Sequence, residues 1–354
     1  MLKLPGLIDP HVHLREPGAV HKEDWDSGTS AALAGGFTMV LAMPNTQPPI
    51  FDASSLDLAL QAARSKARCD YAQFLGAGPA NAEIVAELAP RAAALKMYLD
   101  ATYGELRLDD MGLWAPHFTK YPREFPIVVH AESRSMAAAI LFAALYDRPV
   151  HIAHISLKEE ILLIKAAKEK GIKVTCEVTP HHLFLSSPAS DAKDSLKING
   201  RLEVRPPLAS KTDVEALWEN LTVIDCIATD HAPHTLAEKD SAKPPPGFPG
   251  LETCLPLMLT AVDHQRLTLD DLIQKMHANP RCIFNLPDQP ATWIEVDQNE
   301  EYTLSASTQY TRCGWTPFEG WKVKGRLHKV VLRGKTAFED GKVLAEKGSG
   351  INVR

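Results

Sequence analysis

Short apolar runs alternate with longer segments of helical periodicity from the start of the chain to about residue 280. Several of these runs are unbroken stretches of Val, Ile, Leu and Ala, a pattern typical of parallel strands that are buried on both faces. The runs predict eight strands, at residues 6–13, 38–43, 71–76, 95–99, 127–130, 150–155, 173–178 and 223–229. The segments between them predict helices, among them 54–68, 82–94, 133–146, 157–170 and 211–220.

Strands that alternate with helices eight times indicate an α/β fold, a (β/α)8 TIM barrel. A doubly wound open sheet is the alternative, but no G-x-G-x-x-G follows the first strand. After residue 280 the pattern changes to short strands, at 293–296, 301–304, 322–327, 330–333 and 342–345. We therefore expect a barrel domain over residues 1–285. Residues 286–354 should form a small β-rich C-terminal subdomain that packs on the barrel.

Composition narrows the class of protein. The net charge is −6 and there are no basic runs, which argues against nucleic acid and anionic membranes as partners. The longest uncharged apolar stretch, residues 136–146, is far shorter than the roughly 18 residues that span a bilayer. The six cysteines are scattered without a C-x-x-C pair, which favours a reducing, cytoplasmic compartment. Residues 4–12 already read as one core strand, as in a domain of a longer polypeptide.

Ionisable residues lie at the carboxyl ends of several predicted strands, where the catalytic groups of a barrel gather. They are His11, His13, Lys96, His130, His154, Glu177 and Asp230. His11 and His13 are two residues apart on one strand, so they face the same side and can chelate one ion. Taken singly, each histidine could equally be a core residue with satisfied hydrogen bonds. His151 lies three residues before His154 on the same predicted strand, so its side chain should point to the other face of the strand, toward the helices.

Lys96 is the most unusual of these residues, because an unpaired lysine inside an apolar strand is costly unless it is neutralised. Addition of CO2 to a neutral lysine amine gives an anionic carbamate, whose two oxygens can bridge two divalent ions. Carboxylated Lys96 completes a ligand set for two Zn2+ ions together with His11, His13, His130, His154 and Asp230. Nitrogen and oxygen ligands without thiolates, and with open positions, indicate a catalytic zinc site.

Seven segments together resemble the amidohydrolase superfamily, and more narrowly the dihydroorotases. They are GLIDPHVHLREPG (6–18), MPNT (43–46), LKMYLDAT (95–102), VVHAE (128–132), HIAHIS (151–156), CEVTPHHL (176–183) and ATDHAPH (228–234). The resemblance runs from residue 4 to residue 354. It implies reversible cyclisation of N-carbamoyl-L-aspartate to L-dihydroorotate, a step of pyrimidine biosynthesis.

The same resemblance implies roles for individual residues. Asp230 would be the catalytic base that moves the proton. Arg15 and Asn45 would bind the substrate carboxylate, for which a bidentate arginine is well suited; a surface ion pair of Arg15 with Glu16 or Asp24 is the alternative. Further substrate contacts would come from Thr102, Arg205, His234, Pro246 and Gly247. Thr102 belongs to residues 101–104, which would form a lid, or else only a connection between strand and helix.

The tail of the chain is similar to the dihydroorotase domain of the animal multifunctional pyrimidine-synthesis protein. That likeness implies fusion to, or association with, carbamoyl-phosphate synthetase and aspartate transcarbamoylase, and a homodimer. The animal domain has a cysteine where this chain has Ala153, and that cysteine can hold a third zinc with a glutamate. We therefore expect two zinc ions, with Glu177 hydrogen-bonded to a ligand histidine instead of to a metal.

Two other functions remain as alternatives. The first is another cyclic-amide hydrolase, of the dihydropyrimidinase, hydantoinase or allantoinase type, although the substrates of those enzymes lack the carboxylate that Arg15 and Asn45 would bind. The second is an inactive dihydroorotase-like scaffold domain, although all six metal-ligand positions are present here. A serine or cysteine hydrolase finds no G-x-S-x-G motif and no matching Cys/His pair.

Overall fold

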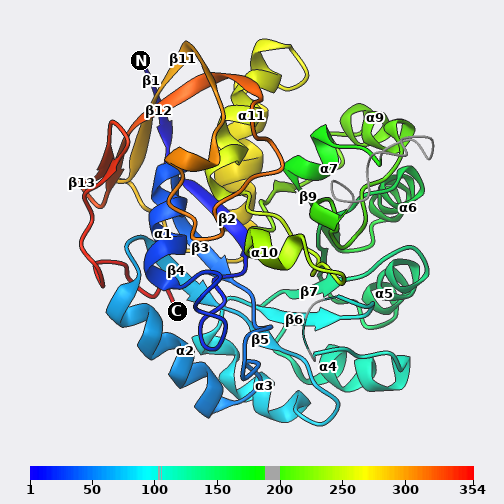
Figure 1. Ribbon diagram of the computed structural model, residues 1–354. Helices are drawn as coiled ribbons and strands as arrows, with labels where there is room; N and C mark the ends of the chain where they lie inside the picture. Colours follow the sequence, from blue (N-terminus) through cyan, green and yellow to red (C-terminus); the bar gives the residue numbers. More distant parts are fainter. Residues whose placement is uncertain (103, 105, 188–199) are drawn as a thin grey trace.

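The parallel strands of the chain form a (β/α)8 barrel, which a computed structural model describes for residues 1–102, 104, 106–187 and 200–354 (Figure 1). Its strands are β2 (Leu7–Val12), β3 (Phe37–Ala42), β4 (Asp70–Gln73), β5 (Leu75–Gly76), β6 (Leu95–Tyr98), β7 (Ile127–His130), β8 (Val150–Ile152), β9 (Val174–Val178) and β10 (Cys226–Ile227). The predicted strand at 71–76 is interrupted at Phe74 and is seen as β4 and β5. The expected barrel is confirmed.

Neighbouring barrel strands pair in parallel, in the orders β2-β3-β4 and β5-β6-β7-β8-β9-β10. The first and last strands meet beyond the end of β10, where Val12 forms a parallel bridge with His231. In the same place the amide of His13 donates to the carbonyl oxygen of His231 at 2.7 Å. These contacts bring the carboxyl ends of β2 and β10 together.

The described residues form a set of α-helices, most of which cover the outside of the barrel (Figure 1). They are α1 (Trp25–Ala34), α2 (Ala53–Lys66), α3 (Ala82–Leu88), α4 (Trp114–Lys120), α5 (Arg134–Leu145), α6 (Lys158–Glu169), α7 (Pro180–Phe184), α9 (Lys211–Glu219), α10 (Leu236–Lys239), α11 (Leu251–Asp263), α12 (Leu269–Ile273) and α13 (Asn279–Ile283). A π-helical turn, η3 (Gln274–Ala278), links α12 to α13. Side-chain caps fix several starts; the Asp24 carboxylate, for example, accepts from the amide of Ser27 at the start of α1.

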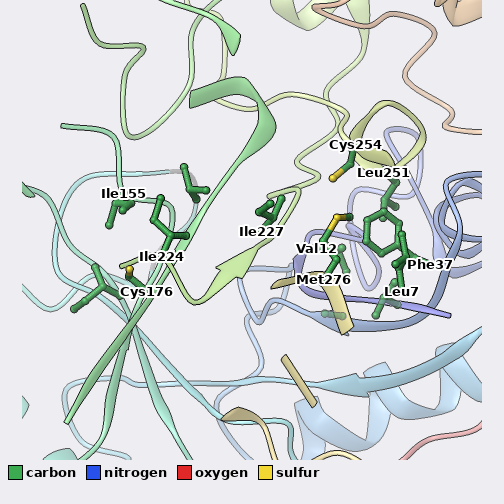
Figure 2. Close-up of a cluster of buried hydrophobic side chains, with 14 of the residues drawn as sticks. Leu7, Val12, Phe37, Ile155, Cys176, Ile224, Ile227, Leu251, Cys254 and Met276 are labelled. Carbon is green, nitrogen blue, oxygen red and sulfur yellow. The ribbon is translucent and has the colours of Figure 1, made fainter. Parts of the chain in front are cut away.

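The alternation of each strand divides its side chains between two apolar layers. Ile8, Leu41, Val128 and Ala153 belong to a small cluster inside the barrel. Residues of the opposite parity pack outward against the helices, and Figure 2 shows part of this larger cluster, with Leu7 of β2 and Phe37 of β3 near Leu251 of α11. Both layers are buried, so the strands read as continuous apolar runs.

The remaining strands form an antiparallel sheet beside the barrel, in the order β1-β11-β12-β13-β14. They are β1 (Leu2–Pro5), β11 (Trp293–Thr303), β12 (Lys322–Leu332), β13 (Lys335–Glu339) and β14 (Lys342–Val343). The prediction that residues 4–12 form one core strand is wrong, because residues 2–5 pair with β11 and only 7–12 enter the barrel. The division at residues 285/286 stays a prediction, and the C-terminal sheet takes its edge strand from the N-terminus.

Among the residues that the structure describes, no helix combines the length and the apolar character needed to cross a membrane.

Candidate metal centre and active site

A pocket opens at the carboxyl ends of the barrel strands and brings together most of the predicted site residues. Its lining consists of His11, His13, Arg15, Asn45, Tyr98, Thr102, His130, His154, Arg205, Asp230, Ala232, Pro246 and Gly247. These residues come from β2, β6, β7 and the segments that follow the barrel strands. Lys96 and Glu177 are buried close by, on β6 and β9.

Three ligand atoms converge at the seam between β2 and β10. Oδ1 of Asp230 lies 3.3 Å from Nε2 of His11 and 3.0 Å from Nε2 of His13. The other ring nitrogens are occupied: Nδ1 of His11 contacts Oε1 of Glu177, and Nδ1 of His13 lies 2.7 Å from Oδ1 of Asn45. Because these oxygens accept, Nδ1 carries the proton in each ring, and both Nε2 lone pairs point to the same place.

A second group of donors lies beside the first, because the ring centroids of His11 and His154 are 5.2 Å apart. Nδ1 of His130 is 2.9 Å from Nε2 of His154, and both rings are buried. Among the described residues, Nζ of Lys96, Nε2 of His130 and Nδ1 of His154 have no hydrogen-bond partner, although Oε1 of Glu132 lies 3.4 Å from Nε2 of His130. Unpartnered buried polar atoms are unusual in folded proteins and call for a ligand.

Burial keeps these groups in the forms that bind metal. It lowers the pKa of His13 to about 4, and it lowers the pKa values of His130 and His154 as well, so the imidazoles are neutral near pH 7. Burial also lowers the pKa of Lys96 to about 8, although nearby Glu177 and Asp230 oppose the shift. Burial alone would raise the pKa of Asp230, but His11 and His13 outweigh it and hold that pKa well below its usual range.

Glu177 connects the group of His11, His13 and Asp230, called the metal-type cluster below, to a histidine deeper in the barrel. One carboxylate oxygen contacts Nδ1 of His11, and the other lies 3.1 Å from Nε2 of His151. The expectation that His151 faces the helices is wrong: it pairs in register with Val128, points into the barrel and packs against Phe284, with ring centroids 5.4 Å apart. With both oxygens engaged, Glu177 is placed to orient His11.

The lining of the same pocket also includes a cationic side chain. Arg15 is buried, and its Nε donates to the carbonyl oxygen of Pro233 at 3.1 Å. Its Nη2 lies 3.1 Å from Nε2 of His234, whose Nδ1 accepts from Nζ of Lys22 at 3.0 Å. Burial, together with the charges of Arg15 and Lys22, holds the pKa of His234 far below its usual range, so the ring is neutral.

The alternative of a surface ion pair for Arg15 does not fit this geometry. Glu16 pairs with Lys66 at 2.6 Å and Asp24 pairs with Arg312 at 2.9 Å, while the Arg15 side chain is buried in the pocket wall. The carbonyl oxygen of Asn45 is engaged by His13, a contact that the resemblance did not imply.

The other predicted substrate contacts also reach the pocket. Arg205 is half-buried and pairs with Glu203 at 3.0 Å, and Thr102 lines the rim. Gly247 has φ +142°, and a Cβ there would lie 2.5 Å from the carbonyl oxygen of Ala232, so only glycine fits at this close approach. The predicted lid at 101–104 includes Tyr103, which lies outside the described residues.

Sequence reasoning missed two residues of this site. Asp9, buried on β2, accepts from the amides of His11 and Thr229 at 3.1 and 3.2 Å. It therefore links β2 to the segment that follows β10. Burial raises its pKa to about 7. Tyr98 lines the pocket with a buried hydroxyl that has no hydrogen-bond partner among the residues that the structure describes. Its position two residues after Lys96 on one strand was the available signal, since such residues share a face.

Three of the nine non-glycine residues with positive φ in the described part of the chain line this pocket. Arg15, His154 and Asp230 have φ values of +59°, +32° and +44°, in the left-handed region that non-glycine residues rarely adopt. Each such residue costs on the order of 1–3 kcal/mol and persists only where the surrounding structure holds it. The strain is therefore consistent with side chains that are aimed at a shared ligand.

The donor set fits a divalent metal. One ligand atom each of His11, His13 and Asp230 lies within 4.8 Å of the others, and the neutral imidazoles and the carboxylate offer lone pairs to that point. The orphaned nitrogens of His130, His154 and Lys96 supply further candidate ligands beside it. Nitrogen and oxygen donors of this kind suit zinc in a catalytic site.

Comparison with known sequences gives consistent results. The profile of the amidohydrolase family matches residues 2–336. The chain is 56% identical over 354 residues to the multifunctional protein CAD of Squalus acanthias, an alignment that covers 100% of this chain and 16% of that protein. It is 38% identical over 364 residues to the dihydroorotase of Pyrococcus furiosus, covering 97% of this chain and 83% of that enzyme.

Solved structures with the same fold include an L-hydantoinase (dihydropyrimidinase) from Arthrobacter aurescens. It superposes with a TM-score of 0.93 at 25% identity, covering 99% of this chain and 88% of that one. An inactive dihydroorotase-like domain of a CAD-like multifunctional protein from Chaetomium thermophilum gives a TM-score of 0.84 at 28% identity, covering 100% and 99%.

We predict that Glu177→Ala weakens metal binding by about 10–100-fold, because Nδ1 of His11 loses the acceptor that fixes the ring. Chelator competition on the purified protein measures this, and circular dichroism reports whether the barrel is intact. Glu177→Gln keeps an acceptor oxygen and serves as the control that should retain most of the affinity. Wild-type affinity in Glu177→Ala would show that Glu177 does not orient His11.

Proposed function

Because this chain belongs to the amidohydrolase family, and to the dihydroorotases within it, we propose that it interconverts N-carbamoyl-L-aspartate and L-dihydroorotate. One observation carries the assignment beyond the family: the pocket that holds the His11–His13–Asp230 cluster is also lined by the buried cation of Arg15. A cyclic amide with a free carboxylate can place its reacting carbonyl at the cluster and its carboxylate at the arginine. The chain spans 16% of the length of the multifunctional relative that it matches.

Two zinc ions are the metals that we propose for the pocket, held by His11, His13, His130, His154, Asp230 and carboxylated Lys96. A lysine with a pKa of about 8 is partly neutral near pH 7, and a neutral amine is the form that adds CO2 and releases a proton. When bound, zinc supplies Lewis-acid polarisation of the amide carbonyl and of the attacking water. Ala153 offers no ligand atom and Glu177 already serves His11 and His151, so we propose two ions and not three.

Asp230 is the group that we assign to proton transfer. Its carboxylate stays ionised near pH 7, because His11 and His13 hold its pKa low. In hydrolysis it accepts a proton from the attacking water and passes it to the ring nitrogen as the amide C–N bond breaks. In cyclisation the same carboxylate takes the proton from the ureido nitrogen that attacks the side-chain carboxyl carbon, and passes it to the carboxyl oxygen that leaves as hydroxide when the C–O bond breaks.

Binding of the substrate carboxylate is the role that we propose for Arg15 and Asn45. The Arg15 guanidinium is held by the carbonyl oxygen of Pro233, to which its Nε donates at 3.1 Å, so its orientation is fixed before the substrate arrives. Arg205, Thr102 and the Pro246–Gly247 segment border the same space and would contact the rest of the ring, and His234, which lies beside Arg15, would add a further contact. The neutral ring of His234 lets it contact the substrate without adding charge.

Turnover of L-dihydroorotate tests the function directly. We expect hydrolysis that a chelator abolishes and that added zinc restores, with close to two zinc ions per chain by metal analysis. Dihydrouracil and hydantoin, which lack the carboxylate, are expected to react far more slowly. Faster turnover of either one would favour the hydantoinase alternative, which the similarity to the Arthrobacter enzyme raises. No turnover of any cyclic amide by the zinc-loaded protein would favour the inactive scaffold.

We also propose that the chain works in the cytoplasm, fused to or associated with carbamoyl-phosphate synthetase and aspartate transcarbamoylase, as its likeness to a multifunctional CAD protein suggests. A homodimer is supported by exposed leucines on α5 and α6. Leu141 and Leu145 lie four residues apart on one helix and are 55% and 69% exposed, and Leu162 on the neighbouring helix is 43% exposed.

The first prediction from this proposal concerns the bridging lysine. Lys96→Ala is expected to lose most of the bound zinc and to lower turnover by several orders of magnitude, because the carbamate that joins the two ions cannot form. Metal analysis and activity on the same preparation check this, and a short carboxylic acid added to the variant should restore part of the activity. A fully active variant would refute the carboxylated-lysine centre.

A second prediction separates substrate binding from metal binding. Arg15→Lys keeps the positive charge but loses the planar fork, so binding of dihydroorotate should weaken by about 1–3 kcal/mol, seen as a higher KM. The zinc content should not change. An unaltered KM would remove Arg15 from the substrate site and reopen the hydantoinase alternative.

The third prediction concerns assembly. Leu145→Glu places a charge in the exposed apolar face and is expected to convert the dimer to monomers in analytical ultracentrifugation. Leu344→Glu, on an equally apolar residue that is 50% exposed in the C-terminal part of the chain, is the control and should leave the dimer intact. If wild type sediments as a monomer, or Leu145→Glu remains a dimer, this face is not the interface.

A further inference from the structure

Lys239, the last residue of α10, is a lysine that the mechanism above does not use. Its side chain is 0% exposed. Nζ donates to the carbonyl oxygen of Glu203 at 2.6 Å and to that of Pro245 at 2.9 Å. The rings of Phe248 and Trp315 flank the same nitrogen, with centroids 5.4 and 5.6 Å away.

These two carbonyls belong to the two segments that carry predicted substrate contacts. Glu203 lies two residues before Arg205, and Pro245 directly precedes Pro246 and Gly247, all three of which line the pocket. The carbonyl oxygen of Glu203 also accepts from the amide of Gly247 at 3.0 Å. A single amine therefore joins segments about 40 residues apart in sequence, and the amide of Gly247 shares its acceptor.

Holding an amine in this place has an electrostatic cost. Burial lowers the pKa of Lys239 to about 7, although the charge of nearby Glu203 opposes the shift. The carbonyl bonds and the aromatic faces offset part of that cost. Because Gly247 lies against Ala232 and His234 with no room for a Cβ, the segment that Lys239 fixes cannot shift toward them.

We propose that Lys239 is a positioning residue, which sets the Pro246–Gly247 backbone and the Arg205 segment at the distance that the substrate needs. The kinetic test of this proposal rests on the function proposed above, whereas its structural test, by hydrogen exchange, does not. Lys239 touches neither the metal-type cluster nor the reacting atoms. Its loss should therefore affect substrate binding more than the chemical step.

The test replaces Lys239 by Met, which keeps the length and removes the donors, and compares it with Lys275→Met. Lys275 is an apt control, because it is also buried and donates to one carbonyl, that of Ile224 at 2.6 Å, before the start of β10 and away from the pocket. Kinetics with L-dihydroorotate and hydrogen exchange of a peptide covering residues 244–250 are measured on all three zinc-loaded proteins, and exchange also on the metal-free ones.

For Lys239→Met we expect KM to rise about tenfold with kcat within about twofold of wild type, the effect of losing a buried charge-assisted hydrogen bond. Zinc content should be unchanged, and the amide of Gly247 should exchange faster with or without metal. Lys275→Met should change neither the KM nor the exchange rate of the Gly247 amide. If Lys239→Met does not fold, Lys239→Gln, which retains one donor group, is expected to show the same changes to a smaller extent.

An unchanged KM and unchanged exchange at Gly247 in either variant of Lys239 would overturn the proposal. So would equal changes in Lys275→Met, which would show a general loss of stability. If the wild-type protein does not turn over dihydroorotate, the proposed function fails, and the exchange of Gly247 still decides whether Lys239 fixes the segment.

Discussion

Closure of the barrel between β2 and β10 is the constraint on which the candidate site depends. His11 and His13 are at the end of the first strand and Asp230 follows the last, so these three ligands meet only when the two strands are joined. The carboxylate of Asp9 on β2 stabilises this closure, because it accepts from the amide of Thr229, just after β10, at 3.2 Å. Closure of the barrel therefore brings these three candidate ligands together, and the same strands in an open sheet would leave them apart.

The pocket combines a carboxylate with a cation. Its lining holds the imidazoles and the Asp230 carboxylate together with the buried Arg15, and beyond Arg15 the amine of Lys22 contacts His234 and pairs with Glu238 at 3.0 Å. His234 is a neutral ring between the two cations: its Nδ1 accepts from Lys22, so its Nε2 carries the proton and donates to the carbonyl oxygen of Pro246 at 3.0 Å. An anionic substrate of the proposed kind would be oriented by this arrangement before any reaction, because its carboxylate is attracted to the guanidinium.

Much of this could be predicted from sequence, because parallel strands buried on both faces give unbroken apolar runs, and their carboxyl ends share one edge. The predicted direction of His151 is wrong, because it assumed that side chains alternate regularly from His151 to His154. His154 has a positive φ, which breaks that alternation, so both side chains point to the inside of the barrel. The pairing of β1 with β11 could not be predicted, because it joins distant segments without a local signal. The side chains of Asp9 and Lys239 bind backbone amides and carbonyls, and the sequence does not indicate which backbone groups a side chain will reach.

The pairing of β1 with β11 also sets an order of events during synthesis. Leu2 lies opposite Val296, so β1 has no partner in this sheet until β11 has been made. The amide of Val353 likewise donates to the carbonyl oxygen of Tyr71 in β4, a barrel strand that is made much earlier. Contacts of such large sequence separation form late and slowly. The barrel strands can pair as they emerge, whereas these two contacts are added afterwards to a barrel that has already formed.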